Sequence, residues 1–145
     1  MSMAQIVNHG LHQGHILKEV CLRSDRLSLS LLNFGAVTRD LRLHDQGEDR
    51  SLVLGFRNPA DYLTNPGYMG VIAGRVAGRI KNARFALDGQ MVRLAENEGG
   101  NQLHGGPAGL SHVLWGIEPL TAASARLTYH SPEGENGYPG TVDFT

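Results

Sequence analysis

The sequence of 145 residues has a single cysteine, no excess of either charge and no long apolar segment. A lone cysteine, Cys21, excludes an internal disulfide and gives no sign of an oxidising compartment. With 13 Lys and Arg residues against 14 Asp and Glu residues, the basic face that nucleic acid needs is not indicated. No apolar run approaches the roughly 20 residues of a membrane helix, and the first residues do not form a signal peptide. We therefore expect a cytoplasmic protein with neither membrane nor nucleic acid as a partner.

Glycine is abundant, at 19 residues, and alternation with a period of two dominates the sequence. Residues 27–31 alternate leucine and serine, which places three leucines on one face of a strand. Ile16, Val20 and Leu22 share a face in the preceding segment, and residues 33–35 supply the turn that follows. No window of useful length has the spacing of an amphipathic helix. The length is that of one domain, so we expect residues 1–145 to form a single all-β domain.

The strongest local prediction is a β-hairpin over residues 85–92. Asp88 and Gly89 stand between two short β-prone runs, and both residue types tolerate the positive φ of a type I′ turn. Residues 113–117, around the only tryptophan, and residues 125–129 are further strand candidates. Many short strands of this kind predict an antiparallel β-sandwich.

Two long segments rich in glycine, proline and asparagine, residues 57–68 and 95–109, interrupt the strands. Loops of this length are uncommon in a compact domain unless they carry function. The second contains His104, and the glycines at 105 and 106 let a ligand come close to the backbone. A histidine side chain donates and accepts protons near neutrality. Taken alone, however, the pattern fits a solvated turn residue at least as well as a catalytic one.

Two arginines, Arg75 and Arg79, each follow a glycine in residues 74–80. Their spacing matches neither a P-loop nor a dinucleotide fingerprint. In an extended strand they share a face but lie about 13 Å apart, at about 3.3 Å per residue. We therefore expect one to bind a ligand and the other to make a structural ion pair, since a guanidinium fork suits vicinal hydroxyls. Two surface arginines on a strand explain the pattern equally well.

A third segment, residues 131–140, is a multi-turn loop. We interpret its carboxylates, Glu133 and Glu135, as solvated turn charges. His112 and His130 flank strand candidates and are interpreted as polar edge residues.

The remaining polar candidates lie near the N-terminus. His9, His12 and His15 recur every three residues, but neither cysteine nor a carboxylate stands at ligand spacing, so we expect a solvated tail and no metal site. Cys21 alternates with core positions and is expected to be a small buried hydrophobe.

Together, and in this order, these segments resemble the aldose 1-epimerase (galactose mutarotase) family. The matching residues are 33–36, 54–56, 61–62, 74–80, 85–89, 103–106, 113–115 and 131–140. The resemblance implies an antiparallel β-sandwich that holds a monosaccharide substrate and interconverts its α and β anomers through the open-chain aldehyde. In this family a carboxylate base takes the proton of the C1 hydroxyl while an imidazolium donates one to the ring oxygen. No cofactor is expected, because ring opening alone forms the carbonyl.

The resemblance also assigns the candidate site residues. By motif match, His104 corresponds to the catalytic and substrate-binding histidine beside the ring oxygen. Arg79 corresponds to the arginine that binds sugar hydroxyls, whereas Arg75 matches a position to which no direct sugar contact is assigned. Gly78 stands where many relatives have asparagine, a difference that bears on the choice of sugar.

Family members run to more than twice this length, and their second histidine, sugar-binding aspartate and glutamate base follow later. The resemblance thus implies the first part of the sandwich, truncated at the C-terminus, with an incomplete acid–base set. Unpaired edges and an uncovered apolar face predict poor stability or self-association through the strand edges. The alternatives are a non-catalytic sugar-binding module, a hexose-phosphate epimerase relative, which the balanced charge does not favour, and a half-sandwich with no function alone.

Overall fold

The computed structural model describes residues 3–12 and 14–145, in which all strand pairs are antiparallel. The strands are β1 (Gln5–His12), β2 (His15–Arg23), β3 (Leu27–Leu32), β4 (Thr38–Asp45), β5 (Glu48–Ser51), β6 (Arg79–Ile80), β7 (Arg84–Leu87), β8 (Gln90–Arg93), β9 (Gln102–Leu103), β10 (Gly116–Thr121), β11 (Ser124–Ser131) and β12 (Val142–Phe144). The short 3₁₀ helices are η1 (Pro59–Thr64), η2 (Lys81–Ala83), η3 (Leu110–His112) and η4 (Glu135–Gly137). The all-β prediction is confirmed. No helix in this part of the chain has the length and apolar character to span a bilayer.

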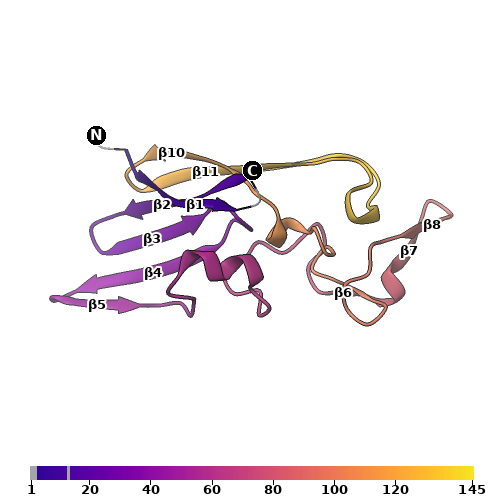
Figure 1. Cartoon of the computed structure of the whole chain (residues 1–145), viewed down its shortest axis with the longest axis horizontal. Helices are drawn as coiled ribbons and strands as arrows, with labels where there is room; N and C mark the ends of the chain where they lie inside the picture. Colours follow the sequence, from indigo (N-terminus) through magenta and orange to yellow (C-terminus); the bar gives the residue numbers. More distant parts are fainter. Residues whose placement is uncertain (1–2, 13) are drawn as a thin grey trace.

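The largest sheet is a meander of β1 to β5 in chain order (Figure 1). The Leu–Ser alternation predicted a strand at residues 27–31, and β3 covers it. Leu32 and Val37 are buried together with Tyr62 of η1, so the first long loop folds back to cover one face of this sheet. The Tyr62 hydroxyl accepts from the Phe56 N–H at 3.0 Å, which fixes that loop.

The second sheet, β10-β11-β12, lies beside the β1–β2 hairpin (Figure 1). The predicted strand at residues 125–129 is confirmed by β11. The strand predicted at residues 113–117 is shifted, because β10 begins only at Gly116. The preceding Trp115 is buried instead, and its indole N–H donates to the carbonyl of Leu110 at 3.0 Å.

The turn predicted at residues 33–35 joins the two sheets. The N–H of Gly35 donates to the carbonyl of Val113, and the N–H of Trp115 donates to the carbonyl of Asn33. Gly35 has a φ of 65°, and a side chain there would meet the backbone of Ser111, so glycine is required at this close approach. The segment that follows the His104 loop, residues 111–115, is therefore anchored to the first sheet.

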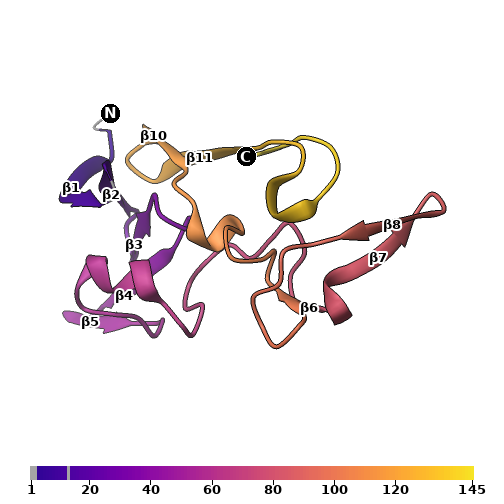
Figure 2. The same ribbon diagram turned by 45° about the vertical axis from the view of Figure 1, so that its right-hand side comes forward.

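The two-stranded sheet β6–β9 and the hairpin β7–β8 extend away from the large sheet (Figure 2). Asp88 and Gly89 connect β7 to β8 with φ values of 50° and 77°, as the predicted type I′ turn requires. Ala83, Leu94 and Tyr138 form a separate buried cluster under this hairpin. Because Tyr138 belongs to the 131–140 loop, that loop helps to form the core here.

Two predictions for the first sheet are wrong, and a third holds in part. Ile16, Val20 and Leu22 lie at alternate positions of β2, as predicted, but Ile16 is 42% exposed at the start of the strand whereas Val20 and Leu22 are buried. Cys21 is exposed, since it lies on the face of β2 opposite to Val20 and its sulfur is 3.8 Å from the Ser30 hydroxyl. The N-terminal histidines are not a solvated tail, because they belong to the β1–β2 hairpin.

His9 of the β1–β2 hairpin takes part in a partly buried cluster of ionisable side chains. Its Nε2 atom lies 2.6 Å from the carboxylate of Glu19, which is 4% exposed. Arg39 of β4 donates to the other oxygen of that carboxylate at 2.9 Å. A buried carboxylate is costly unless it is paired, so this arrangement binds three strands of the sheet together.

Candidate sugar-binding site

The pairing of β6 with β9 brings the two predicted site residues together. Arg79 stands opposite Leu103 in this ladder, so Arg79 and His104 are neighbours although 25 residues separate them in the sequence. The backbone N–H of His104 donates to the carbonyl of Gly78 at 3.0 Å. In the described residues only Arg79 and Ile80 of the predicted 74–80 strand are in a ladder.

The His104 ring is held by a backbone donor. The N–H of Gly78 donates to Nδ1 of His104 at 3.0 Å. Nδ1 must therefore be the unprotonated nitrogen of the neutral ring, so Nε2 carries the proton. This bond fixes both the tautomer and the direction of the imidazole, and it presents an N–H donor on the side of the ring away from Gly78.

The backbone around His104 is held in left-handed conformations. His104 has a φ of 50°, and Gly105 follows with a φ of 91°. A Cβ atom at Gly105 would collide with the carbonyl of Gly74, so only glycine allows this approach. Gly105, one of the two glycines that the sequence suggested would admit a ligand, thus serves first to pack the His104 loop onto residues 74–75.

Tyr68 was not identified from the sequence. Its ring packs edge-to-face against His104, with centroids 4.8 Å apart, and against His112, with centroids 5.6 Å apart. His112 is therefore an interior residue of the site rather than a strand edge, and its Nδ1 atom lies 2.9 Å from the Ser111 hydroxyl. Burial lowers the pKa of His112, which favours the neutral imidazole. The sequence feature that could have pointed to Tyr68 is the long loop of residues 57–68, which ends at this residue.

Glu98 is the second residue that sequence reasoning missed. Nε and Nη2 of Arg79 donate to its two carboxylate oxygens at 2.5 and 2.6 Å, a bidentate pair. The hydrogen bond from Arg79 lowers the pKa of Glu98, and in turn Glu98 raises the pKa of Arg79. Glu98 reaches this position because Gly99 and Gly100, both at positive φ, form a tight turn. Nη1 of Arg79 makes no hydrogen bond to the described residues, so it can donate to a ligand.

Arg75 has a different role. Its guanidinium donates five hydrogen bonds to the 131–140 loop: to the Ser131 hydroxyl and to the carbonyls of Ser131, Pro132, Pro139 and Gly140. Arg75 is therefore occupied by the protein itself. Of the two arginines, it is Arg79 that makes the predicted ion pair, with Glu98, whereas Arg75 binds carbonyls.

Comparison with known proteins identifies the family. The sequence model of the aldose 1-epimerase family matches residues 18–145. The chain belongs to the aldose 1-epimerase family. It is 41% identical over 122 residues to the galactose mutarotase of Sus scrofa, an alignment that covers 83% of this chain and 35% of the relative. It is 36% identical over 138 residues to the maltose epimerase of Levilactobacillus brevis, covering 93% and 41%.

A solved structure agrees with the sequence relatives. The galactose 1-epimerase of Lactobacillus acidophilus NCFM superposes with a TM-score of 0.83 and 28% identity, over 97% of this chain and 42% of that chain. The predicted fold, an antiparallel β-sandwich of the galactose mutarotase kind, is confirmed. The chain spans about two fifths of the length of these relatives, or somewhat less.

Within this family fold, the 131–140 loop is less exposed than expected. Glu133 is exposed, as predicted, but Glu135 is half-buried and accepts hydrogen bonds from Tyr129, at 2.5 Å, and from the Ser131 hydroxyl. Burial, together with the hydrogen bond to Glu135, raises the pKa of Tyr129 to about 12. His130, by contrast, is polar and exposed, but it lies near the C-terminal end of β11 rather than outside the strand, and its Nδ1 atom is 2.6 Å from the Asp143 carboxylate.

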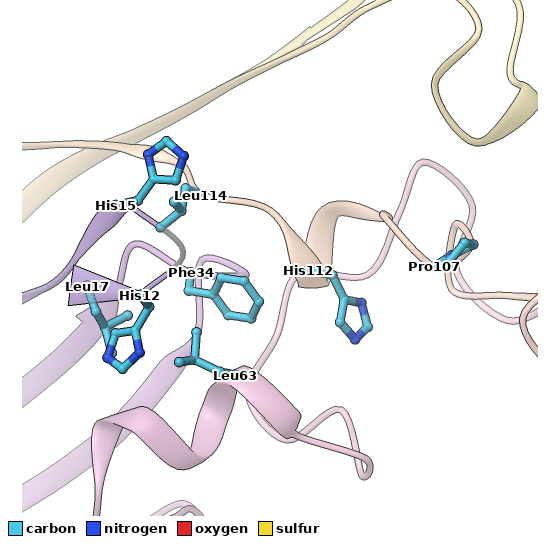
Figure 3. A pocket seen from close by; sticks show the side chains of 8 residues that line it. All are labelled: His12, His15, Leu17, Phe34, Leu63, Pro107, His112 and Leu114. Atoms are coloured by element: carbon cyan, nitrogen blue, oxygen red, sulfur yellow. The ribbon is translucent and has the colours of Figure 1, made fainter. Parts of the chain in front are cut away.

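A cavity of about 470 Å³ adjoins the site on the side of His112 (Figure 3). Phe34 and His112 approach it from different segments, and Leu63 of η1 lines it as well. Two of the N-terminal histidines, His12 and His15, complete one wall, which again contradicts a solvated tail. In the part of the chain that the structure describes, no three His, Cys, Asp or Glu side chains have the geometry of a metal site.

Proposed function

We propose that the whole protein interconverts the α and β anomers of a free aldohexose, such as galactose or glucose. In this proposal the present chain supplies the substrate-binding Arg79 and the catalytic and substrate-binding His104. The observation that carries the proposal is the bond from the Gly78 N–H to His104 Nδ1. It directs Nε2–H of a proton-exchanging side chain away from Gly78, one position along the β6–β9 ladder from Arg79, whose Nη1 can donate to a hydroxyl.

The chemistry then follows from these two groups. Nε2–H of His104 donates to the ring oxygen of the sugar, which weakens the bond between that oxygen and C1. A base removes the proton of the C1 hydroxyl, the C1–O bond to the ring breaks, and the ring oxygen takes up a proton from an acid for which the family's second histidine, in the later part of the protein, is the candidate. An open-chain aldehyde with a free hydroxyl at the former ring oxygen results. Rotation about the C1–C2 bond and the reverse steps give the other anomer. The fork of Arg79 holds sugar hydroxyls during the rotation.

The identity of the base separates this proposal from a second one. Among the described residues no carboxylate hydrogen-bonds to His104, and Glu98 is already committed to Arg79. This observation favours a non-catalytic sugar-binding module as the second candidate. A hexose-phosphate substrate has less support, because Arg75 and Arg79 are engaged by the protein and leave no guanidinium pair for a phosphate.

We further propose that this chain self-associates. β1 and β5 are the edge strands of the large sheet in the described residues, and apolar side chains near them are exposed. Leu11 is 72% exposed and Leu54 is 82% exposed. Open edges next to exposed apolar groups favour pairing with another copy. We also propose the cytoplasm as its location, from the single cysteine.

Polarimetry of freshly dissolved α-D-galactose tests the catalytic proposal. The protein is compared with His104→Gln, which keeps a polar side chain but cannot exchange protons, and with His130→Gln at an exposed position of β11. We expect His104→Gln to slow mutarotation about 10²–10⁴-fold, the usual contribution of one acid–base group, and His130→Gln to leave it unchanged. Equal rates for the protein and His104→Gln would refute the role of His104. Sugar binding without acceleration over buffer would support the binding module.

A further inference from the structure

The 131–140 loop contacts the segment that carries His104 on both sides of the histidine. Two residues before it, Gln102 is 1% exposed, and its Oε1 accepts from the hydroxyl of Tyr138. The Gln102 amide also donates to the carbonyls of Ala95, at 3.1 Å, and Asn136, at 3.4 Å. The N-terminal end of the His104 loop is therefore fixed by buried, fully paired polar groups.

On the other side of His104, the side chain of Asn136 pairs with one backbone unit. Its Oδ1 accepts from the N–H of Ala108 at 3.0 Å, and its Nδ2 donates to the carbonyl of Ala108 at 2.8 Å. Gly106 packs directly against this amide, because a Cβ atom there would lie 3.1 Å from Oδ1 of Asn136. One side chain thus pairs with both the N–H and the carbonyl of Ala108, the fourth residue after His104.

The 131–140 loop is itself tied to the segment that orients the histidine ring. Arg75 binds both ends of the loop, and three residues later Gly78 donates its N–H to His104 Nδ1. The three segments 75–79, 102–108 and 131–140 therefore form a closed set of contacts around His104. Asn136 is the only member of the third segment whose side chain bonds to the 102–108 backbone in the described residues.

We propose that Asn136 is a positioning residue for His104. Its side-chain amide fixes the 104–108 backbone relative to residues 75–79. At this separation the Gly78 N–H reaches Nδ1 of His104, and Nε2–H of His104 faces the ligand. Asn136 itself makes no hydrogen bond to the His104 ring, so it acts through the loop. Its φ of 51° is left-handed, a conformation that asparagine tolerates better than most residues. This inference rests on the proposed role of His104.

The test variant is Asn136→Gly. Glycine keeps the left-handed backbone and the Asn136 carbonyl contacts but removes the bridge to Ala108. Asn82→Gly is the matched control: Asn82 has a φ of 54°, and its side chain makes no hydrogen bond to the described residues. Hydrogen exchange of the Gly78 amide reports the bond to His104, and the Leu32 amide, which donates to Val37, reports the first sheet. Nitrogen-15 shifts of the His104 ring report its tautomer.

We expect Asn136→Gly to speed exchange of the Gly78 amide about tenfold, the factor equivalent to one lost hydrogen bond. The His104 nitrogens should move towards averaged shifts, while the Leu32 amide and the Asn82→Gly variant stay unchanged. Asn136→Asp, which keeps the acceptor for the Ala108 N–H, should give an intermediate effect. Unchanged Gly78 exchange, or an equal rise at Leu32, would overturn the proposal. No sugar is needed, so the outcome is independent of whether His104 catalyses mutarotation.

Discussion

Replacing Arg75 by lysine keeps the positive charge but removes the planar fork that holds the 131–140 loop. Of the five hydrogen bonds that Arg75 donates, the two to the hydroxyl and carbonyl of Ser131 are partly buried. The other three reach exposed carbonyls, where water can replace the guanidinium. A hydrogen bond from a charged group contributes about 1.5–3 kcal/mol, and lysine can still donate some of the five. The expected loss is therefore about 2–3 kcal/mol in the free energy of unfolding.

Urea unfolding measures this loss, with unchanged m-values showing that the transition remains comparable. Arg126→Lys is the control, because the one ion pair that Arg126 makes with the described residues is to the exposed Glu118, at 3.3 Å, and an exposed pair contributes at most about 1 kcal/mol. We expect the control to stay within about 0.5 kcal/mol of the parent protein. An Arg75→Lys variant equally close to the parent would refute the reasoning, since the loop would then be held without the guanidinium fork.

Three further predictions concern the turn glycines, the buried tyrosine and the sheet edges. Gly105→Ala should destabilise far more than Gly100→Ala in thermal unfolding, because both glycines have positive φ but only Gly105 has a backbone carbonyl, that of Gly74, in the way; equal losses would argue against the tight packing. The tyrosinate absorbance of Tyr129 should appear near pH 12, above the value of about 10 for a tyrosine in water. Because its folded-state pKa is raised, the stabilisation by the Tyr129–Glu135 bond is complete below pH 10 and lost as the pH rises through about 12; a midpoint near 10 would contradict it. Sedimentation velocity should show dimers or larger species that dissociate on dilution, whereas a stable monomer with a single cooperative melt would remove the proposed edge pairing.

The sequence predicted most reliably what short-range chemistry decides. Asp88 and Gly89 carry the conformational preference of their turn in their own side chains, so the hairpin was found without tertiary information. The alternation of residues 27–31 similarly predicted β3. Cys21 shows the limit of this reasoning, because a period of two separates the faces of a strand but does not say whether the second face is covered.

The site was predicted only in part because its geometry is not local. His104 and Arg79 were identified by resemblance, but their positions in adjacent rungs depend on the β6–β9 ladder. Glu98 and Tyr68 have no distinctive sequence context, and each becomes recognisable only when a distant segment is placed against it. The N-terminal histidines were misjudged for the same reason, since strand pairing with β2 orders a segment that polarity alone suggests is solvated.

The central claim is that an aldose binds between Arg79 and His104, and titration of the nitrogen-15-labelled protein with galactose tests it most directly. The account predicts saturable shifts of the Arg79 guanidinium, the His104 ring and the Gly78 amide, while the exposed residue His130 stays unchanged. Saturable shifts confined to other parts of the chain, with these three groups unperturbed, would contradict it.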